Sequence, residues 1–271
     1  MFPVMLHYDS IMDKTAVVAN KLHLMLLFFT FKGTGANMKY EIFGSEVQFI
    51  KITLDPGESV IAESGTLMSM DDGVSLEPVM DTKNDKSMMS SLWQATKRVV
   101  SGDKVFMSKY TNKANVLKQL SVAPEFAGKI IALSSSSVLC QKGSFLIGQA
   151  PVNISVALTK RLGAGLFGNE GFILQKIDSS KQIFVIASGS VLEKTLAPGE
   201  KIRLEPGCIV AFEPSVDFSV EAAELKNIAL GNTDLFYSTL TGPGKIWLQS
   251  HPQSKFWDRI MKFIPKPETK A

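Results

Sequence analysis

Short apolar strands separated by turns dominate the pattern from residue 38 to residue 250. Apolar and polar residues alternate in EVQFIKITL and in KIWLQS, as expected of strands with one buried face. Proline and glycine mark turns between such segments, in DPGE, DDG, APGE, EPG and GPG. The pattern therefore predicts a mainly β protein, with a single domain over residues 38–250.

The turns recur at a spacing that indicates an internal repeat. LDPGE at 54–58 is matched by LAPGE at 196–200, and the degenerate copy VAPEFAG lies between them at 122–128. Neighbouring copies are about 70 residues apart. A glycine that precedes an apolar strand recurs at nearly the same period. The residues that mark these turns are Pro56, Gly57, Gly102, Gly168, Pro198, Gly199 and Gly242.

These landmarks predict three pseudo-symmetric β repeats, at about residues 38–112, 113–178 and 179–250. One repeat alone leaves an apolar sheet face exposed, whereas three together bury these faces in a common core. A period this long favours one compact domain over an open solenoid. The expected architecture is therefore a closed β barrel or prism-like domain with pseudo-threefold symmetry and short peripheral helices.

A glycine pattern inside the second repeat resembles a nucleotide-binding fingerprint. Gly163, Gly165 and Gly168 spell G-x-G-x-x-G. That fingerprint follows a strand and opens a helix, with an acidic residue about twenty positions later. Here Gly168 leads into GFILQKI, whose β-branched and aromatic residues favour a strand. We therefore interpret these glycines as turn residues and expect no nucleotide cofactor.

Several stretches of the repeats resemble a known family. They are GAGLFGNEGFILQK, TGPGKIWLQS, ESGTLMSMDDGV after the LDPGE turn, and SGDKVFMSKYT. Over about residues 38–250 they are similar to the bacterial branch of the mitochondrial-biogenesis family named for altered inheritance of mitochondria (its twenty-fourth member). The resemblance implies a β fold similar to the tryptophan RNA-binding attenuation protein, repeated three times in one chain. It defines no catalytic residue, and one departure is Asn169, where the commoner form has glycine.

Composition and charge exclude several classes of function. Hydrophobic residues make up 45% of the 271 residues, and the net charge is only +3, so no nucleic-acid partner is expected. Cys140 and Cys208 lie in apolar runs without a C-x-x-C motif, which argues against a metal site and favours a reducing, cytoplasmic compartment. With three histidines in the chain, we expect no catalytic residue, no cofactor and no metal.

Two matched glutamates were candidates for acid–base chemistry. Glu58 and Glu200 follow Pro-Gly at equivalent places in the first and third repeats, but Phe126 stands at that place in the second. We therefore interpret the two carboxylates as surface turn residues rather than as a catalytic pair.

The first 37 residues differ from the rest of the chain. The apolar run at 22–31 is about ten residues long, half of what a membrane-spanning helix needs. Met38 is followed at once by a strand pattern. We interpret residues 1–37 as a non-core extension that precedes the true start, and a membrane-targeting leader is the alternative.

Two other stretches have helical periodicity. MMSSLWQATKRVV at 88–100 predicts a helix that covers one end of the domain, or that contacts a membrane or partner. SKFWDRIMKFIPKPETKA predicts a short amphipathic helix within 251–271, which Ser254 caps and Pro265 ends. This second helix is expected to dock on its own domain or on a neighbouring subunit, or to lie on an anionic membrane. Its candidate contact residues are Phe256, Trp257, Arg259, Ile260, Lys262 and Phe263.

These features together predict a non-enzymatic scaffold or binding protein. A homo-oligomer is expected because exposed sheet edges need cover. Protein partners and peripheral contact with the inner face of a membrane are further expectations. The alternative function is a small-ligand-binding regulatory protein with a pocket between repeats.

Overall fold

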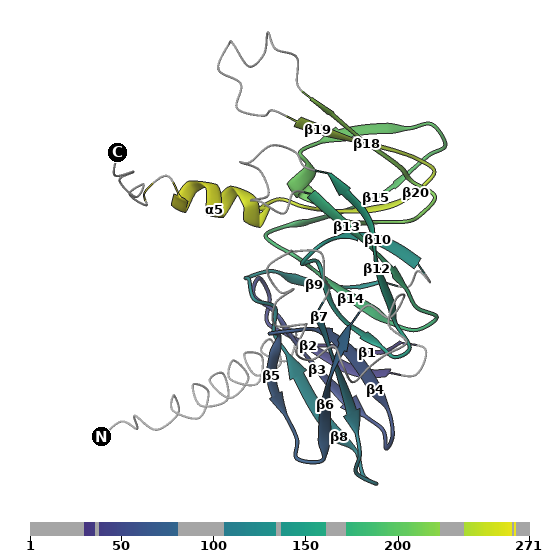
Figure 1. The fold of residues 1–271 in the computed structure, drawn as a ribbon, viewed down its shortest axis with the longest axis vertical. Coiled ribbons are helices and arrows are strands. Elements are labelled where there is room, and N and C mark those ends of the chain that lie inside the picture. The colour runs from purple at the N-terminus through teal and green to yellow at the C-terminus, as the bar shows by residue number, and fades with distance from the viewer. Residues whose placement is uncertain are drawn as a thin grey trace, which may run out of the picture.

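The computed structural model describes residues 30–35, 38–80, 106–133, 137–160, 172–222, 236–261 and 263. Within these ranges the chain is mainly β, as the sequence predicts, and every strand pairing is antiparallel. The described strands form four sheets, named A to D here. The sheets follow one another along the long axis of the molecule, from the purple strands to the yellow ones (Figure 1).

Sheets A and B contain the first half of the chain. Sheet A has the order β1 (Thr30–Gly35), β2 (Met38–Phe43), β3 (Phe49–Leu54), β8 (Lys118–Val122) and β5 (Leu67–Met70). Sheet B has the order β6 (Val74–Met80), β7 (Phe106–Asn112), β4 (Ser59–Glu63), β11 (Phe145–Gln149), β14 (Ile183–Ala187) and β9 (Lys129–Leu133).

Sheets C and D contain most of the second half. Sheet C has the order β12 (Asn153–Lys160), β13 (Phe172–Asp178), β10 (Ser137–Gln141), β17 (Ile209–Phe212), β20 (Gly244–Gln249) and β15 (Val191–Leu196). Sheet D has the order β16 (Lys201–Leu204), β19 (Phe236–Thr241) and β18 (Asp217–Ala222). A short 3₁₀ turn, η4 (Pro206–Cys208), precedes β17, and the helix α5 (Gln253–Met261) follows β20.

Three hydrophobic cores lie between the four sheets. The first joins residues of sheets A and B, such as Ile52 and Phe184. The second joins sheets B and C, for example through Val185 and Val138, and the third joins sheets C and D through residues such as Phe212 and Leu240. Sheets B and C therefore carry a core on each of their faces.

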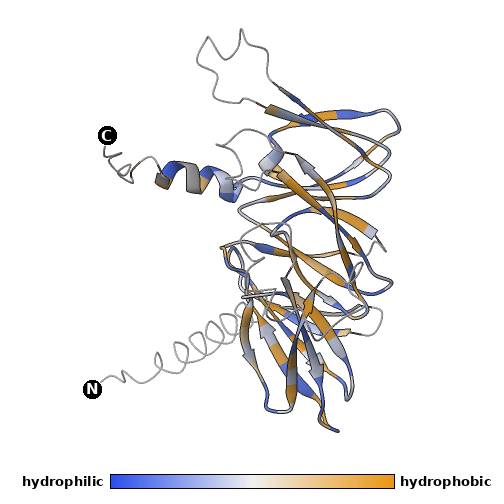
Figure 2. Cartoon of the chain, viewed as in Figure 1, coloured by the Kyte–Doolittle hydropathy of each residue, from blue (hydrophilic) through white to orange (hydrophobic). Residues whose placement is uncertain are grey.

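The predicted closed barrel or prism-like domain is wrong. Among the described strands each sheet has two edge strands, and none of the four sheets closes on itself. The physical reason is visible in the central strands β11 and β14, in which every residue is buried. β14 is orange over most of its length in Figure 2, at the place where Figure 1 labels it. A barrel wall buries one face of each strand, whereas a strand that is apolar on both faces needs cover on both sides.

Strand pairing also crosses the predicted repeat boundaries. β4 of the first repeat pairs with β11 of the second, which pairs with β14 of the third. The pseudo-threefold arrangement and the attenuation-protein fold are not confirmed. The predicted boundaries at 37/38 and 250/251 stay predictions, although β1, inside the segment interpreted as an extension, pairs with β2 at the edge of sheet A. The predicted helix at 88–100 and the glycines at 163–168 lie outside the described residues.

Candidate functional site

A small cavity lies where the start of α5 meets the β sheets. It has a volume of about 70 Å³ and is lined by side chains from separate parts of the chain. Glu63 comes from the end of β4, Glu125 and Phe126 from the β8–β9 connection, and Gln253 from the first position of α5. Leu146 of β11 adds an apolar wall.

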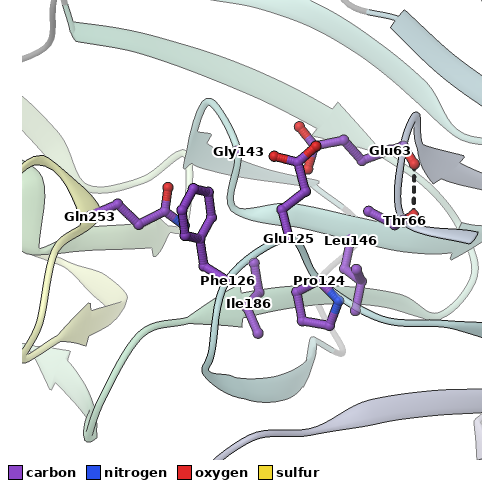
Figure 3. A pocket seen from close by; sticks show the side chains of 9 residues that line it. All are labelled: Glu63, Thr66, Pro124, Glu125, Phe126, Gly143, Leu146, Ile186 and Gln253. Carbon is purple, nitrogen blue, oxygen red and sulfur yellow. Dashed lines mark hydrogen bonds between the residues drawn. The ribbon is translucent and has the colours of Figure 1, made fainter. Parts of the chain in front are cut away.

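The two glutamates of this cavity point toward each other (Figure 3). The turn after β4 is fixed by Thr66, whose hydroxyl donates a hydrogen bond of 2.7 Å to the backbone oxygen of Glu63. Burial, together with the neighbouring Glu125 carboxyl, raises the pKa of Glu63 from 4.5 to about 7, and the ammonium group of Lys142 opposes this shift. Glu63 therefore keeps its proton up to about neutral pH.

A buried thiol lies in the field of the same carboxyl. Cys140 of β10 is fully buried, and burial raises the pKa of its thiol, with a further contribution from Glu63. A thiol held in its neutral form is a poor nucleophile. Cys140 therefore acts as a packed apolar residue of the second core.

The size of the cavity limits what it can hold. Pockets for metabolites and cofactors are commonly about 300–1,000 Å³. At about 70 Å³ this cavity has room for a few water-sized groups. Among the described residues no group of three or more His, Cys, Asp and Glu side chains is placed to hold a metal ion.

The sequence contains a signal for this site that pattern reasoning missed. In the turns at 54–58 and 196–200, proline is followed by Gly-Glu, whereas in the degenerate copy Pro124 is followed by Glu125 and Phe126. These two substituted positions are the ones that line the cavity. The degeneracy of the middle turn was therefore informative, because both substituted residues line the cavity.

The two matched turn glutamates have the same local role. Glu58 Oε2 accepts a hydrogen bond of 2.9 Å from the backbone N–H of Asp55, and Glu200 Oε2 accepts one of 2.9 Å from that of Ala197. Glu58 also accepts a bond of 2.7 Å from Gln149 Nε2. Both carboxylates thus close their own turns and do not converge on a common site.

The other predicted turn residues lie beside these carboxylates. Gly57 and Gly199 have positive φ values of 79° and 76°, and each follows its proline, Pro56 or Pro198. Gly242 packs directly against the third turn, since an added Cβ would lie 2.3 Å from the backbone oxygen of Ala197. Gly102 and Gly168 lie outside the described residues.

α5 is the other candidate contact element, and it extends away from the sheets (Figure 1). Its first turn is fixed: Lys255 forms an ion pair with Glu205, and Pro252 is buried. Further along, Phe256 is 47% exposed and Phe263, just beyond the helix, is 80% exposed.

Arg259 is also exposed, and Ile260 is half-buried. The side chain of Trp257 and the whole of Lys262 lie outside the described residues. Of the described helices, none has the length and apolar character required to cross a membrane.

The family model for mitochondrial biogenesis AIM24 matches residues 40–251. The chain belongs to the AIM24 family. This confirms the family resemblance, whereas its bacterial branch is not confirmed. No curated protein matches the chain.

The fold of this AIM24 chain also occurs in a crystal structure of a protein from Streptococcus pyogenes. The two share 20% of aligned residues and superpose with a TM-score of 0.65, over 84% of this chain and 100% of the other. At this identity the likeness shows the fold alone. The match over 40–251 includes Glu63 and Glu125 of the cavity lining and the β strands that precede α5.

Proposed function

We propose that this AIM24 chain is a non-enzymatic scaffold that works as a homo-oligomer, with α5 as its principal contact element. The observation that carries the proposal is the exposure of Phe256 on a helix that is fixed to the sheets at its first turn, together with that of Phe263 just beyond the helix. Exposed aromatic side chains beside a rigid body are typical of protein contact sites.

A second copy fits α5 better than a membrane surface does. Stable attachment of a short helix to anionic lipid needs several basic residues, each worth about 1 kcal/mol. Lys255 is exposed but already paired with Glu205, and Arg259 is the other basic residue among the described positions of α5. We place the protein in the cytoplasm, with contact to the inner face of a membrane as the alternative.

A metabolite-binding role receives less support. The cavity beside α5 is several times smaller than a typical metabolite pocket. Its lining is acidic and largely built from turns, so a proton or a small group suits it better than an organic ligand.

Replacement of one exposed aromatic residue tests the proposal. Light scattering on the full chain is expected to show an oligomer, and Phe256→Ser is expected to shift it to smaller species. Val47→Ser is the matched control, because Val47 is 66% exposed in a turn far from α5 in the sequence. An unchanged mass for Phe256→Ser would contradict the role of α5.

An experiment with lipid vesicles distinguishes contact with a membrane from contact with a second copy. Sedimentation with vesicles that contain about 30% anionic lipid is expected to leave the full chain in the supernatant. Co-sedimentation that Phe256→Ser abolishes, with no change in oligomer mass, would assign α5 to the membrane instead.

A further inference from the structure

The cavity connects the acidic pair to the base of α5. Glu125 and Phe126 are consecutive residues of the β8–β9 connection, and Gln253 opens α5; all three line the same cavity (Figure 3). Any movement of this connection therefore changes the surface against which the first turn of α5 rests.

The opposite side of that first turn is tightly packed. An added Cβ at Gly207 would lie 2.8 Å from Ser254 Oγ and 3.1 Å from Pro252 Cβ. The backbone N–H of His251 donates a hydrogen bond of 3.2 Å to Ser188. The start of α5 is thus in contact with η4 as well as with the cavity lining.

The titratable groups around Glu63 come from three segments. Glu125 lies on the β8–β9 connection, Lys142 in the β10–β11 turn, and the neutral thiol of Cys140 in β10. Two ionised carboxylates that face each other in a small cavity repel, whereas a protonated and an ionised carboxyl do not. Because the pKa of Glu63 is about 7, the change between these two states falls in the physiological range.

We propose that Glu63, facing Glu125 across the cavity, is a proton-controlled attachment point for α5: a proton on Glu63 keeps the β8–β9 connection against Gln253, and loss of that proton loosens the helix. The effect of this attachment on oligomer assembly rests on the proposed function of α5. The attachment itself does not rest on that function, because it is a contact within one chain.

Amide hydrogen exchange on the full chain, corrected for intrinsic rates, tests this attachment at pH 6 and pH 8. Exchange over residues 253–261 is expected to be at least about threefold faster at pH 8, because Glu63 has then lost its proton. Glu63→Gln and Glu125→Gln each remove one negative charge, so both are expected to show the same protection at the two pH values. Glu221→Gln, on the exposed edge strand β18, is the matched control and is expected to behave as the wild type.

His251, which directly precedes Pro252 and α5, is the residue to test as a competing source of a pH effect. His251→Gln is expected to retain the wild-type pH dependence. Protection that is independent of pH in the wild type, or that loses its pH dependence in His251→Gln but not in Glu63→Gln, would overturn the proposal. The same measurement is repeated in the Phe256→Ser variant, in which assembly through α5 is removed. It tests the attachment within one chain separately from the proposed oligomer.

Discussion

Phe184 and Val185 are consecutive residues of β14, and they belong to different hydrophobic cores. Phe184 packs with sheet A, where its ring meets the edge of Tyr40 with the ring centroids 4.7 Å apart. Val185 packs on the opposite face, in the core shared with sheet C. This alternation is the property that makes the molecule a stack of sheets.

Removal of the Phe184 ring tests the contribution of the first core. Phe184 is 0% exposed, so Phe184→Ala is expected to lower the free energy of unfolding by about 3–4 kcal/mol. Leu192→Ala is the control, because Leu192 is 53% exposed on the edge strand β15 and is expected to change stability by less than about 0.5 kcal/mol. Urea unfolding of both variants measures the difference. Equal effects would contradict the double-sided burial of sheet B.

The two turn glutamates are expected to differ in importance although they close their turns alike. Glu58→Ala removes acceptors for Asp55 and for the buried amide of Gln149, and is expected to cost about 2 kcal/mol. Glu200→Ala removes the bond to Ala197 and an exposed ion pair with Lys194, so its effect is expected to be smaller. Thermal unfolding gives the order of the two variants, and a larger loss for Glu200→Ala would refute this assignment.

Gly207 is expected to control the attachment of α5. A methyl group at this position would press on Ser254 and Pro252, so Gly207→Ala is expected to loosen α5 at a cost of about 1–2 kcal/mol. Gly148→Ala is the control, because its methyl group would press on Val152 and Ile183 within the sheets. Hydrogen exchange should rise selectively over 253–261 in the first variant and more broadly in the second. Unchanged exchange over 253–261 in Gly207→Ala would show that α5 does not depend on this contact.

The stability of the protein is expected to depend on pH through Glu63. Its pKa is about 7 in the folded chain and 4.5 in the reference state, so between these values the folded protein holds a proton that the unfolded chain has released. Stability therefore falls as the pH rises from 4.5 to 7, by on the order of 3 kcal/mol, with no further loss from this group above that range. Urea unfolding at pH 5 and pH 8 is expected to show this loss in the wild type and to lack it in Glu63→Gln. An equal loss in both proteins would assign it to other groups.

The sequence predicts the β class, the turns and the family, because these depend on local chemistry. Alternation, proline and glycine report strand and turn positions directly. The prediction of a closed barrel was wrong because the regular spacing of the turns was interpreted as threefold symmetry about an axis. The continuous apolar run IFVIA at 183–187 indicated a strand buried on both faces, which is incompatible with a barrel wall.

The acidic cavity was not predictable from spacing. Glu63 and Glu125 are far apart in the sequence, and only the fold brings the end of β4 and the β8–β9 connection to the same cavity. The available signal was the replacement of Gly-Glu by Glu-Phe in the middle turn, at Glu125 and Phe126. Such a departure identifies a special position, whereas its partner, Glu63, emerges only from the fold.

Native mass spectrometry of the full chain, purified from its own cell, tests the central claim most directly. The account predicts a single symmetric oligomer without additional mass, which Phe256→Ser converts to smaller species. A monomer that carries a reproducible adduct of metabolite or lipid size would contradict it, and would show a ligand-binding protein instead of a self-associated scaffold.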